Sequence, residues 1–303
     1  MRVLVTGASG FLGSGVCDAL LARGDEVVGL TRDSDRARGA NPTVTWHSWN
    51  PTVERPPPSA LEGVDGVVNL IGESLDQRWT DAAKQRIRES RERATKNLVD
   101  ALSATDPRPR ALVSQSAVGY YGDRGDAIVD ESVGPGTSFD SEVCVAWEAA
   151  AHAAEEVDVR VAVTRSGLVL GPDSGLLKQL LLPFKLGLGG PIAGGAQYMS
   201  WIHIQDEVDL LLWALDTDTA SGTYNATSPN PVTNREFSKT LGRVLGRPAV
   251  VPIPKLALQA RFGEELGEIA TGGQRVVPRR ALDAGFEFRH PELEPALRDL
   301  LQR

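Results

Sequence analysis

The sequence is poor in cysteine and has no long apolar run. Only two cysteines occur among its 303 residues, Cys17 and Cys144, and this number suggests neither a disulfide framework nor a metal site. We expect Cys17 to be a small core residue of the first helix. No apolar run approaches membrane-spanning length, and no signal peptide precedes the first apolar segment. The expected location is therefore the cytoplasm, without a membrane partner.

Positive charge is also scarce. Lys and Arg total 32 against 40 Asp and Glu, which gives a net charge of -8. An acidic balance argues against nucleic acid as the main partner. Hydrophobic residues make up 41% of the chain, and at this length they can bury the core of about two domains or one large α/β unit. We expect an enzyme-sized protein with a small-molecule substrate, and we leave a homo-oligomer open.

The first thirteen residues, MRVLVTGASGFLG, carry the strongest motif. A β-branched strand pattern is followed by glycines at 7, 10 and 13 and by a helical pattern. Gly7 can take the positive φ of a tight turn, Gly10 lets a pyrophosphate approach the backbone, and Gly13 lets helix pack on strand. The N–H groups of the helix N-terminus bind phosphate oxygens. This order predicts a dinucleotide site. The cofactor residues expected here are Gly7, Ser9, Gly10, Phe11, Leu12 and Gly13.

The residues after the second predicted strand, 26–30, set the choice of cofactor. NAD sites commonly place an acidic residue there for the ribose 2′-hydroxyl, whereas a 2′-phosphate is bound by a cation and hydroxyls. Thr31 and Arg32 come first in this chain. We favour NADP(H), with the Arg32 guanidinium on the 2′-phosphate. Asp33 follows one position later and leaves NAD as the less favoured cofactor.

Two more strand ends are expected at the cofactor. After the strand at 44–46, Asn50 is placed either to hydrogen-bond adenine or to form a plain turn before proline. After the strand at 66–70, a loop lies at the strand's carboxyl end, the edge where open parallel sheets bind ligands. The next segment predicts one charged helix from Thr80 to about Ala104, with its Lys and Arg residues in solvent. The cofactor residues expected from the loop are Leu70, Gly72, Glu73 and Arg78.

The segment LVSQSAVGYYG, residues 112–122, indicates a catalytic position. Ser116 should emerge at the carboxyl end of its strand, where a hydroxyl can hydrogen-bond a substrate beside the nicotinamide. The alternative is a serine that only caps the strand end. Tyr120 is a candidate partner of Ser116 in acid/base catalysis, although a tyrosine in a GYYG turn is also typical of packing. We place Ser114, from the same strand, in the cofactor site.

These motifs together resemble the short-chain dehydrogenase/reductase superfamily in its extended, epimerase-like form. Within it the chain is most similar to an atypical NAD-dependent epimerase/dehydratase-like group. The motifs of that group are NLxGE, RW, SAVGYYG, WE and GQRVxP, which stand here at 69–73, 78–79, 116–122, 147–148 and 273–278.

The resemblance implies an α/β fold with a Rossmann-like, doubly wound parallel sheet. Residues 1–170, completed by about 204–230, would form the NADP-binding domain, and 171–203 with 231–303 a smaller C-terminal substrate-binding region. It also implies that Glu73 and Arg78 line the cofactor channel and that Val169 lies near the nicotinamide.

One feature of the superfamily is missing. Typical members carry a Tyr and a Lys four residues apart on the helix after the serine, where the ammonium lowers the phenol pKa. That helix reads SFDSEVCVAWEAAA, which offers either Asp140 with Cys144 or Cys144 with Glu148. No lysine occurs between Lys96 and Lys178, so the usual proton relay is absent. For Cys144 and Glu148 we favour structural roles.

The C-terminal part is expected to contact substrate. Residues 176–182 predict an apolar helix that Pro183 ends or kinks, and Asp206 is placed to cap a helix over 207–215. The candidate substrate residues are Lys185, Trp201, His203 and Arg275. The alternative for Lys185 is a solvated charge, and the alternative for His203 is a structural role.

Two classes of function fit these features. One is an NADP(H)-binding oxidoreductase or nucleotide-sugar-epimerase-like enzyme, in which the nicotinamide performs hydride transfer. The other is a non-catalytic NADP(H)-binding protein that reports redox state. Cofactor residues are expected in both. The missing Tyr/Lys pair favours the second or an altered chemistry, whereas a glycine-bordered pocket lined by Trp201, His203 and Arg275 favours an enzyme.

Overall fold

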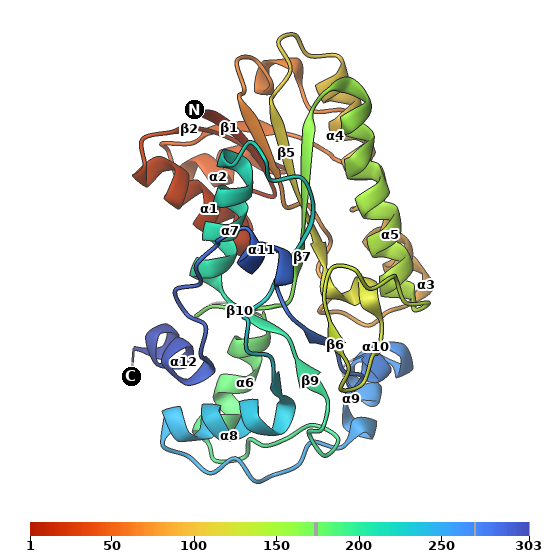
Figure 1. Ribbon diagram of the computed structural model, residues 1–303, viewed down its shortest axis with the longest axis vertical. Coiled ribbons are helices and arrows are strands. Elements are labelled where there is room, and N and C mark those ends of the chain that lie inside the picture. The colour runs from red at the N-terminus through yellow and green to blue at the C-terminus, as the bar shows by residue number, and fades with distance from the viewer. Residues whose placement is uncertain (173–174, 270, 303) are drawn as a thin grey trace.

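A sheet of seven parallel strands forms the centre of the molecule (Figure 1). The structure is a computed structural model that describes residues 1–172, 175–269 and 271–302. The strand order is β11-β7-β5-β4-β1-β2-β3, so successive crossovers run outward in opposite directions from the β1/β4 pair. In such sheets, ligands bind at the carboxyl ends of the two strands where the order reverses. The predicted Rossmann-like, doubly wound fold is confirmed.

The strands of this sheet are β1 (Arg2–Thr6), β2 (Glu26–Thr31), β3 (Thr45–Ser48), β4 (Gly66–Asn69), β5 (Ala111–Ala117), β7 (Arg160–Ser166) and β11 (Gly222–Ala226). Short strands pair outside it: β6 (Ile128–Val129) with β13 (Arg275–Val276), β8 (Leu168–Leu170) with β10 (Trp201–His203), and β9 (Tyr198–Met199) with β12 (Val232–Thr233).

The helices are α1 (Phe11–Ala22), α2 (Ser34–Ala40), α3 (Asp81–Glu89), α4 (Glu92–Ser103), α5 (Phe139–His152), α6 (Gly175–Lys185), α7 (Ile204–Asp216), α8 (Asn234–Leu245), α9 (Lys255–Phe262), α10 (Glu264–Ile269), α11 (Arg279–Asp283) and α12 (Leu293–Leu301). Short 3-10 turns are η1 (Pro58–Ala60), η2 (Val118–Tyr121) and η3 (Ala153–Val157).

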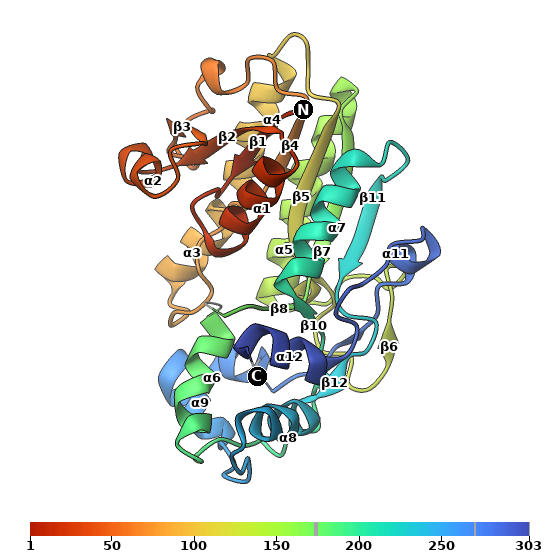
Figure 2. The ribbon, with the colours of Figure 1, turned by 90° about the vertical axis from the view of Figure 1, so that its left-hand side faces the viewer.

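Two apolar layers cover the sheet. Figures 1 and 2 show α1 and α7 on one face and α4 and α5 on the other, and each pair has its own core cluster. Strands β1 and β7 contain the largely apolar runs RVLVT and RVAV, and nearly every residue of these two strands is buried. Parallel strands covered by helices on both faces require this pattern. The layers hold the strand ends in fixed positions.

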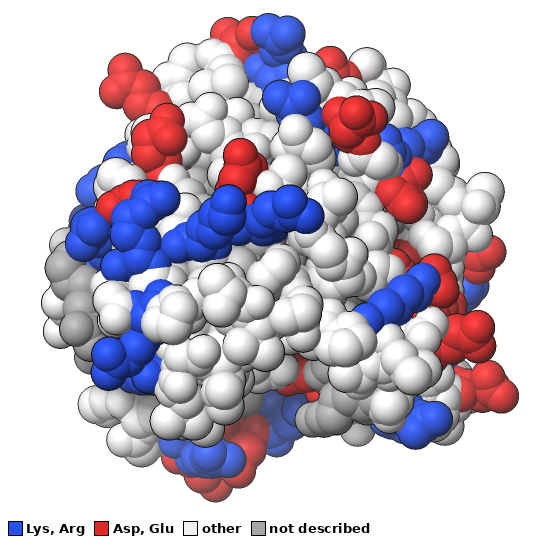
Figure 3. Space-filling view, turned by 90° about the horizontal axis from the view of Figure 1, so that it is seen from below, with Lys and Arg blue, Asp and Glu red and all other residues white. Residues whose placement is uncertain are grey.

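The C-terminal elements lie below the carboxyl ends of the strands (Figure 1). Helices α6, α8 and α12 pack around a third core cluster that contains Phe184, Trp201 and Phe237. Seen from below, a line of Lys and Arg side chains crosses a largely uncharged surface (Figure 3). Several apolar side chains of this region are exposed, among them Leu182 and Leu256.

Three local predictions were wrong or incomplete. The single helix predicted from Thr80 is broken after Glu89, so α3 and α4 are separate. His203 rather than Asp206 caps α7, because the helix begins at Ile204. Pro183 lies inside α6 and does not end it. None of the described helices combines the length and apolar character needed to cross a membrane.

Candidate functional site

A cleft of about 370 Å³ opens at the carboxyl ends of β1, β2 and β4, the position at which the strand order reverses. It takes its walls from the glycine turn after β1, the ends of β2 and β3, the loop after β4, and α3. The lining residues are Gly7, Ser9, Gly10, Leu30, Thr31, Arg32, Trp49, Asn50, Pro51, Thr52, Leu70, Ile71, Gly72, Glu73, Arg86, Glu89 and Ser90.

The glycine turn has the shape that a pyrophosphate requires. Gly7 has φ +63°, and a Cβ there would stand 2.8 Å from the carbonyl oxygen of Leu70. A Cβ on Gly13 would stand 2.2 Å from the carbonyl oxygen of Gly7, so the helix can approach the turn only because position 13 is glycine. A Cβ on Gly10 would meet only the Gly7 oxygen, at 3.1 Å. Gly10 therefore leaves an open approach to the backbone.

The first turn of α1 is free to receive negative charge. Its N-cap, Gly10, provides no side-chain hydrogen bond, and the first turn contains no acidic residue. The backbone N–H groups at a helix start have no partner within the helix and carry partial positive charge. Together with the open face of Gly10, they fit a phosphate group.

The end of β2 carries the residues that were predicted to select between the two dinucleotides. Ser9 and Thr31 hydroxyls lie 3.1 Å apart, and Arg32 lines the cleft beside them with an exposed side chain. The Asp33 carboxylate instead accepts the backbone N–H of Arg36 at 3.0 Å and caps α2. Asp33, the acidic residue that would favour NAD, therefore caps α2, whereas Ser9, Thr31 and Arg32 line the cleft.

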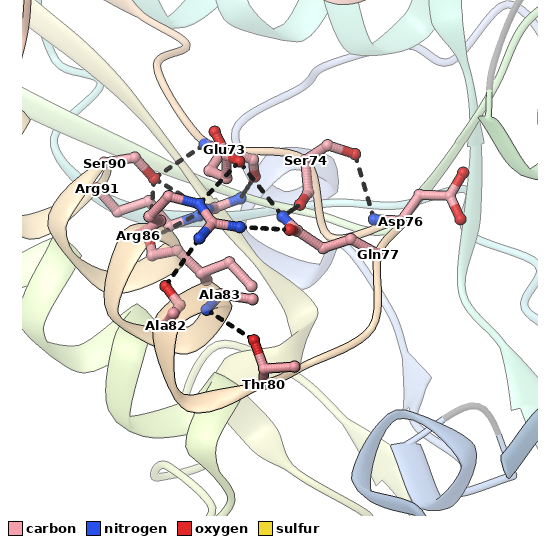
Figure 4. Close-up of polar contacts among 11 residues, drawn as sticks. Glu73, Ser74, Asp76, Gln77, Thr80, Ala82, Ala83, Arg86, Ser90 and Arg91 are labelled. Carbon is pink, nitrogen blue, oxygen red and sulfur yellow. Dashed lines mark hydrogen bonds and ion pairs between the residues drawn. The ribbon is translucent and has the colours of Figure 1, made fainter. Parts of the chain in front are cut away.

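The loop after β4 is fixed from two sides (Figure 4). The backbone N–H of Glu73 donates to Ser90 Oγ at 2.9 Å, and Arg91 Nη2 donates to the Glu73 carbonyl at 3.1 Å. The Glu73 carboxylate extends toward Arg86, whose Nε lies 3.6 Å from Glu73 Oε1. Arg86 Nη2 also donates to Gln77 Oε1 at 2.9 Å. The break between α3 and α4 supplies the residues that hold this loop.

Arg86 was not predicted at the site, whereas Arg78 was. Arg78 is not among the residues that line the cleft, and its Cγ lies 3.9 Å from the place of a Cβ on Gly263. The spacing of the sequence could have indicated Arg86, because it stands three residues before Glu89 and four before Ser90. Residues at this spacing share one helical face, and all three line the cleft.

Five other predicted cofactor residues are not among the residues that line the cleft. Ser114 Oγ accepts the Asn69 amide at 3.1 Å in a buried contact between β5 and β4. The Phe11 ring packs so closely on Gly171 that a Cβ there would stand 2.4 Å from Phe11 Cζ. Val169 pairs with Ile202 between β8 and β10. Leu12 and Gly13 are likewise buried in α1 and lie outside the cleft lining.

Ser116 belongs to a buried ionic network. Only 1% of Ser116 is exposed, and its hydroxyl donates to Glu148 Oε1 at 2.7 Å. Arg165 donates from Nε to Glu148 Oε1 and from Nη2 to Oε2, both at 2.8 Å. Burial works to lower the pKa of Arg165, but its hydrogen bonds with Glu148 outweigh burial and raise it. The guanidinium remains charged.

The aromatic pair of the GYYG turn packs on the same guanidinium. Arg165 Nη1 donates to the Tyr121 hydroxyl at 2.9 Å, and that hydroxyl donates to Asn225 Oδ1 at 2.7 Å. Burial raises the pKa of Tyr121 to about 12, so its phenol stays protonated at neutral pH. The Tyr120 ring lies against Arg165, 3.3 Å from Cζ to the ring centroid. No motif in the sequence indicated this role of Arg165.

Cys144 is a buried thiol beside this network. Its Sγ contacts the carbonyl of Ala117 at 3.7 Å. Burial raises its pKa to about 12, although Arg91 acts in the opposite direction. A thiol in this state is a poor nucleophile.

Comparisons with known proteins agree with this geometry. The model of the NAD dependent epimerase/dehydratase family matches residues 3–227. The chain belongs to this family. A domain of unknown function, DUF1731, matches residues 253–300.

Relatives cover the whole chain. The epimerase family protein MT2273 of Mycobacterium tuberculosis is 40% identical over 97% of this chain and 96% of its own length. Human epimerase family protein SDR39U1 is 38% identical over 99% of this chain and all of its own length. The crystal structure of human SDR39U1 isoform 2 with NADPH has a TM-score of 0.89 at 35% identity and covers both chains completely.

The substrate residues predicted for this epimerase family member are spread over three elements, β10, α6 and β13. Trp201 has no exposed surface, and its indole N–H donates to the Asn230 carbonyl at 3.1 Å. His203 is buried and accepts the N–H of Gln205. Burial lowers its pKa to about 4, so it is neutral at pH 7.

The two predicted cations of this set lie on different elements, α6 and β13. Lys185 is exposed at the end of α6. Arg275 lies half-buried in β13 with its guanidinium over the Tyr198 ring, 5.0 Å from the centroid. Any substrate site that uses both must therefore span α6 and β13.

Proposed function

We propose that this member of the epimerase/dehydratase family binds NADP(H) in the cleft between β1, β2 and β4. The observation that carries the proposal is the end of β2, where Arg32 and Thr31 face the cleft while Asp33 caps α2. The open backbone at Gly10 and the first turn of α1 would hold the pyrophosphate, and Asn50, which also lines the cleft, would contact the adenine. The NADPH-bound structure of human SDR39U1 supports the same choice.

The substitution Arg32→Ala tests the cofactor. It should weaken NADPH binding by about 1.5 to 3 kcal/mol, the scale of a charge-assisted hydrogen bond, and change NADH binding little. Calorimetric titration of both nucleotides into wild type and variant measures the difference. An equal loss for the two nucleotides would contradict the assignment of the guanidinium to the 2′-phosphate.

For activity, we propose an NADP(H)-dependent oxidoreductase or epimerase-like enzyme that acts on a small molecule. The cofactor supplies or accepts hydride when bound. Ser116 already donates its proton to Glu148, so its oxygen can only accept a hydrogen bond from a substrate hydroxyl. A proton could then pass from substrate to Ser116 and from Ser116 to Glu148 Oε1. Arg165 orients this carboxylate by binding both of its oxygens.

A second candidate, a non-catalytic NADP(H)-binding redox sensor, is favoured by a different observation. Ser116 is 1% exposed, and its partner Glu148 is already bound by Arg165 through both oxygens. A screen for hydride exchange and reduction, over carbonyl compounds and sugar nucleotides, separates the two. Turnover supports the enzyme, whereas tight NADPH binding without turnover supports the sensor. Mass spectrometry of the ligand retained through native purification identifies the cofactor independently.

A further inference from the structure

Arg86 stands in the cleft wall on the opposite side of the glycine turn from Arg32. Strand β1 lies between β2 and β4 in the sheet. Arg32 follows β2, and Glu73, the carboxylate nearest Arg86, follows β4. The two cations therefore flank the turn that ends at Gly10. A dinucleotide with its 2′-phosphate at Arg32 would carry its diphosphate over this turn, toward the Arg86 side.

Arg86 is held in place by weak and replaceable contacts. Its Nη1 donates to the Ala82 carbonyl at 3.2 Å and its Nη2 to Gln77 Oε1 at 2.9 Å, while the ion pair to Glu73 spans 3.6 Å (Figure 4). The side chain is 54% exposed. Ion pairs of this length and exposure contribute little, so a phosphate can replace the Glu73 carboxylate.

The loop around Glu73 can stay still during this exchange. Ser90 accepts its backbone N–H and Arg91 donates to its carbonyl, so the backbone is bound independently of the carboxylate. Only the side chains of Glu73 and Arg86 need to change partners. Figure 4 shows the Arg86 guanidinium reaching toward Glu73 beside Ser90 and Arg91.

We propose that Arg86 is a second phosphate-binding residue of the cofactor site. It releases the Glu73 carboxylate and binds the diphosphate of the dinucleotide in its place. The inference rests on the proposed NADP(H) function. Guanidinium groups bind phosphate oxygens through two parallel N–H donors, and Arg86 presents its donors at the cleft wall. Glu73 competes with the phosphate for Arg86, so the two side chains have opposite effects on affinity.

The test is calorimetric titration of the full chain with NADPH, NADH and adenosine 2′-monophosphate, which lacks a diphosphate. Arg86→Gln should weaken NADPH and NADH equally, by about tenfold or more, and leave adenosine 2′-monophosphate unchanged. Glu73→Gln should tighten both dinucleotides. Arg88→Gln is the matched control, because Arg88 lies on the same helix but bonds Glu142 of α5 at 3.0 Å, and it should bind all three ligands as wild type does.

Two outcomes overturn the inference. Wild-type affinity of Arg86→Gln for both dinucleotides would show that Arg86 does not contact the diphosphate. A loss confined to NADPH and adenosine 2′-monophosphate would place Arg86 at the 2′-phosphate instead. A wild-type protein that binds neither dinucleotide would overturn the proposed function itself, which distinguishes the two failures.

Discussion

Breaking the Glu148–Arg165 pair should destabilise the protein strongly. The side chains are only 9% and 5% exposed, respectively, and Arg165 binds both carboxylate oxygens. Removing one partner of a buried pair leaves an uncompensated charge and costs about 3 to 5 kcal/mol. Glu148→Gln keeps the size of the side chain and removes the charge, so we expect a loss in this range. Arg165→Met should cost a similar amount.

The double variant Glu148→Leu/Arg165→Met separates charge from packing. Replacing both partners by apolar groups removes the buried charges together and is often nearly neutral, so the double variant should be more stable than either single one. Urea unfolding followed by tryptophan fluorescence and far-UV circular dichroism gives the free energies if the two probes coincide. A loss below about 1 kcal/mol for Glu148→Gln, the scale of an exposed pair, would refute the reasoning. So would a double variant as unstable as the sum of the single ones.

Three further predictions follow from the turn, the network and a buried carboxyl. Gly10→Val should abolish dinucleotide binding in a folded protein, whereas Gly13→Ala should destabilise the fold because its Cβ would stand 2.2 Å from the Gly7 carbonyl oxygen. Calorimetric titration and circular dichroism of both variants measure these effects, and unchanged NADPH affinity of Gly10→Val would contradict the first expectation. If the protein is an enzyme, Ser116→Ala should reduce turnover roughly 100-fold with little change in NADPH affinity, while Cys144→Ser should leave turnover nearly unchanged. The screen for hydride exchange and reduction measures both variants, and activity that survives the serine change but is lost with the cysteine change would assign catalysis to Cys144 instead. Burial raises the pKa of Glu207 from 4.5 to about 8, so the contribution of its protonated carboxyl to stability should be full below pH 4.5 and decrease by about 1.4 kcal/mol per pH unit up to about pH 8. Urea unfolding of wild type and Glu207→Gln should show a difference in stability that follows this slope, and a difference that does not change with pH would argue against it.

The glycine turn could be predicted because its geometry is encoded locally. Each glycine has a position in the sequence that corresponds to one steric demand, and the structure shows tight approaches at Gly7 and Gly13 with open space at Gly10. The parallel strands were also readable, since continuous apolar runs are typical of strands buried on both faces.

The break between α3 and α4 could not be read in this way. No glycine or proline interrupts the segment from Asp81 to Ser103, so local propensity favours one helix. The hydroxyl of Ser90 instead accepts the N–H of Glu73, 17 residues earlier in the chain, and a contact of this kind depends on the assembled fold.

The partners of Ser116 depend on the fold in the same way. The sequence favoured a structural role for Glu148 but indicated none for Arg165, because the contact joins β5, α5 and β7. Asp206 illustrates a one-turn error: the helix begins earlier, and its carboxylate accepts the N–H groups of Arg289 and His290.

The use of Asp33 as a helix cap limits how cofactor preference can be redesigned. Its carboxylate cannot turn to a ribose 2′-hydroxyl without releasing the Arg36 N–H and loosening the first turn of α2, and an N-cap is worth about 1 kcal/mol. A variant directed toward NADH would therefore need its new acidic group at position 32, with Asp33 kept in place. Arg32→Asp is the substitution from which such engineering should start.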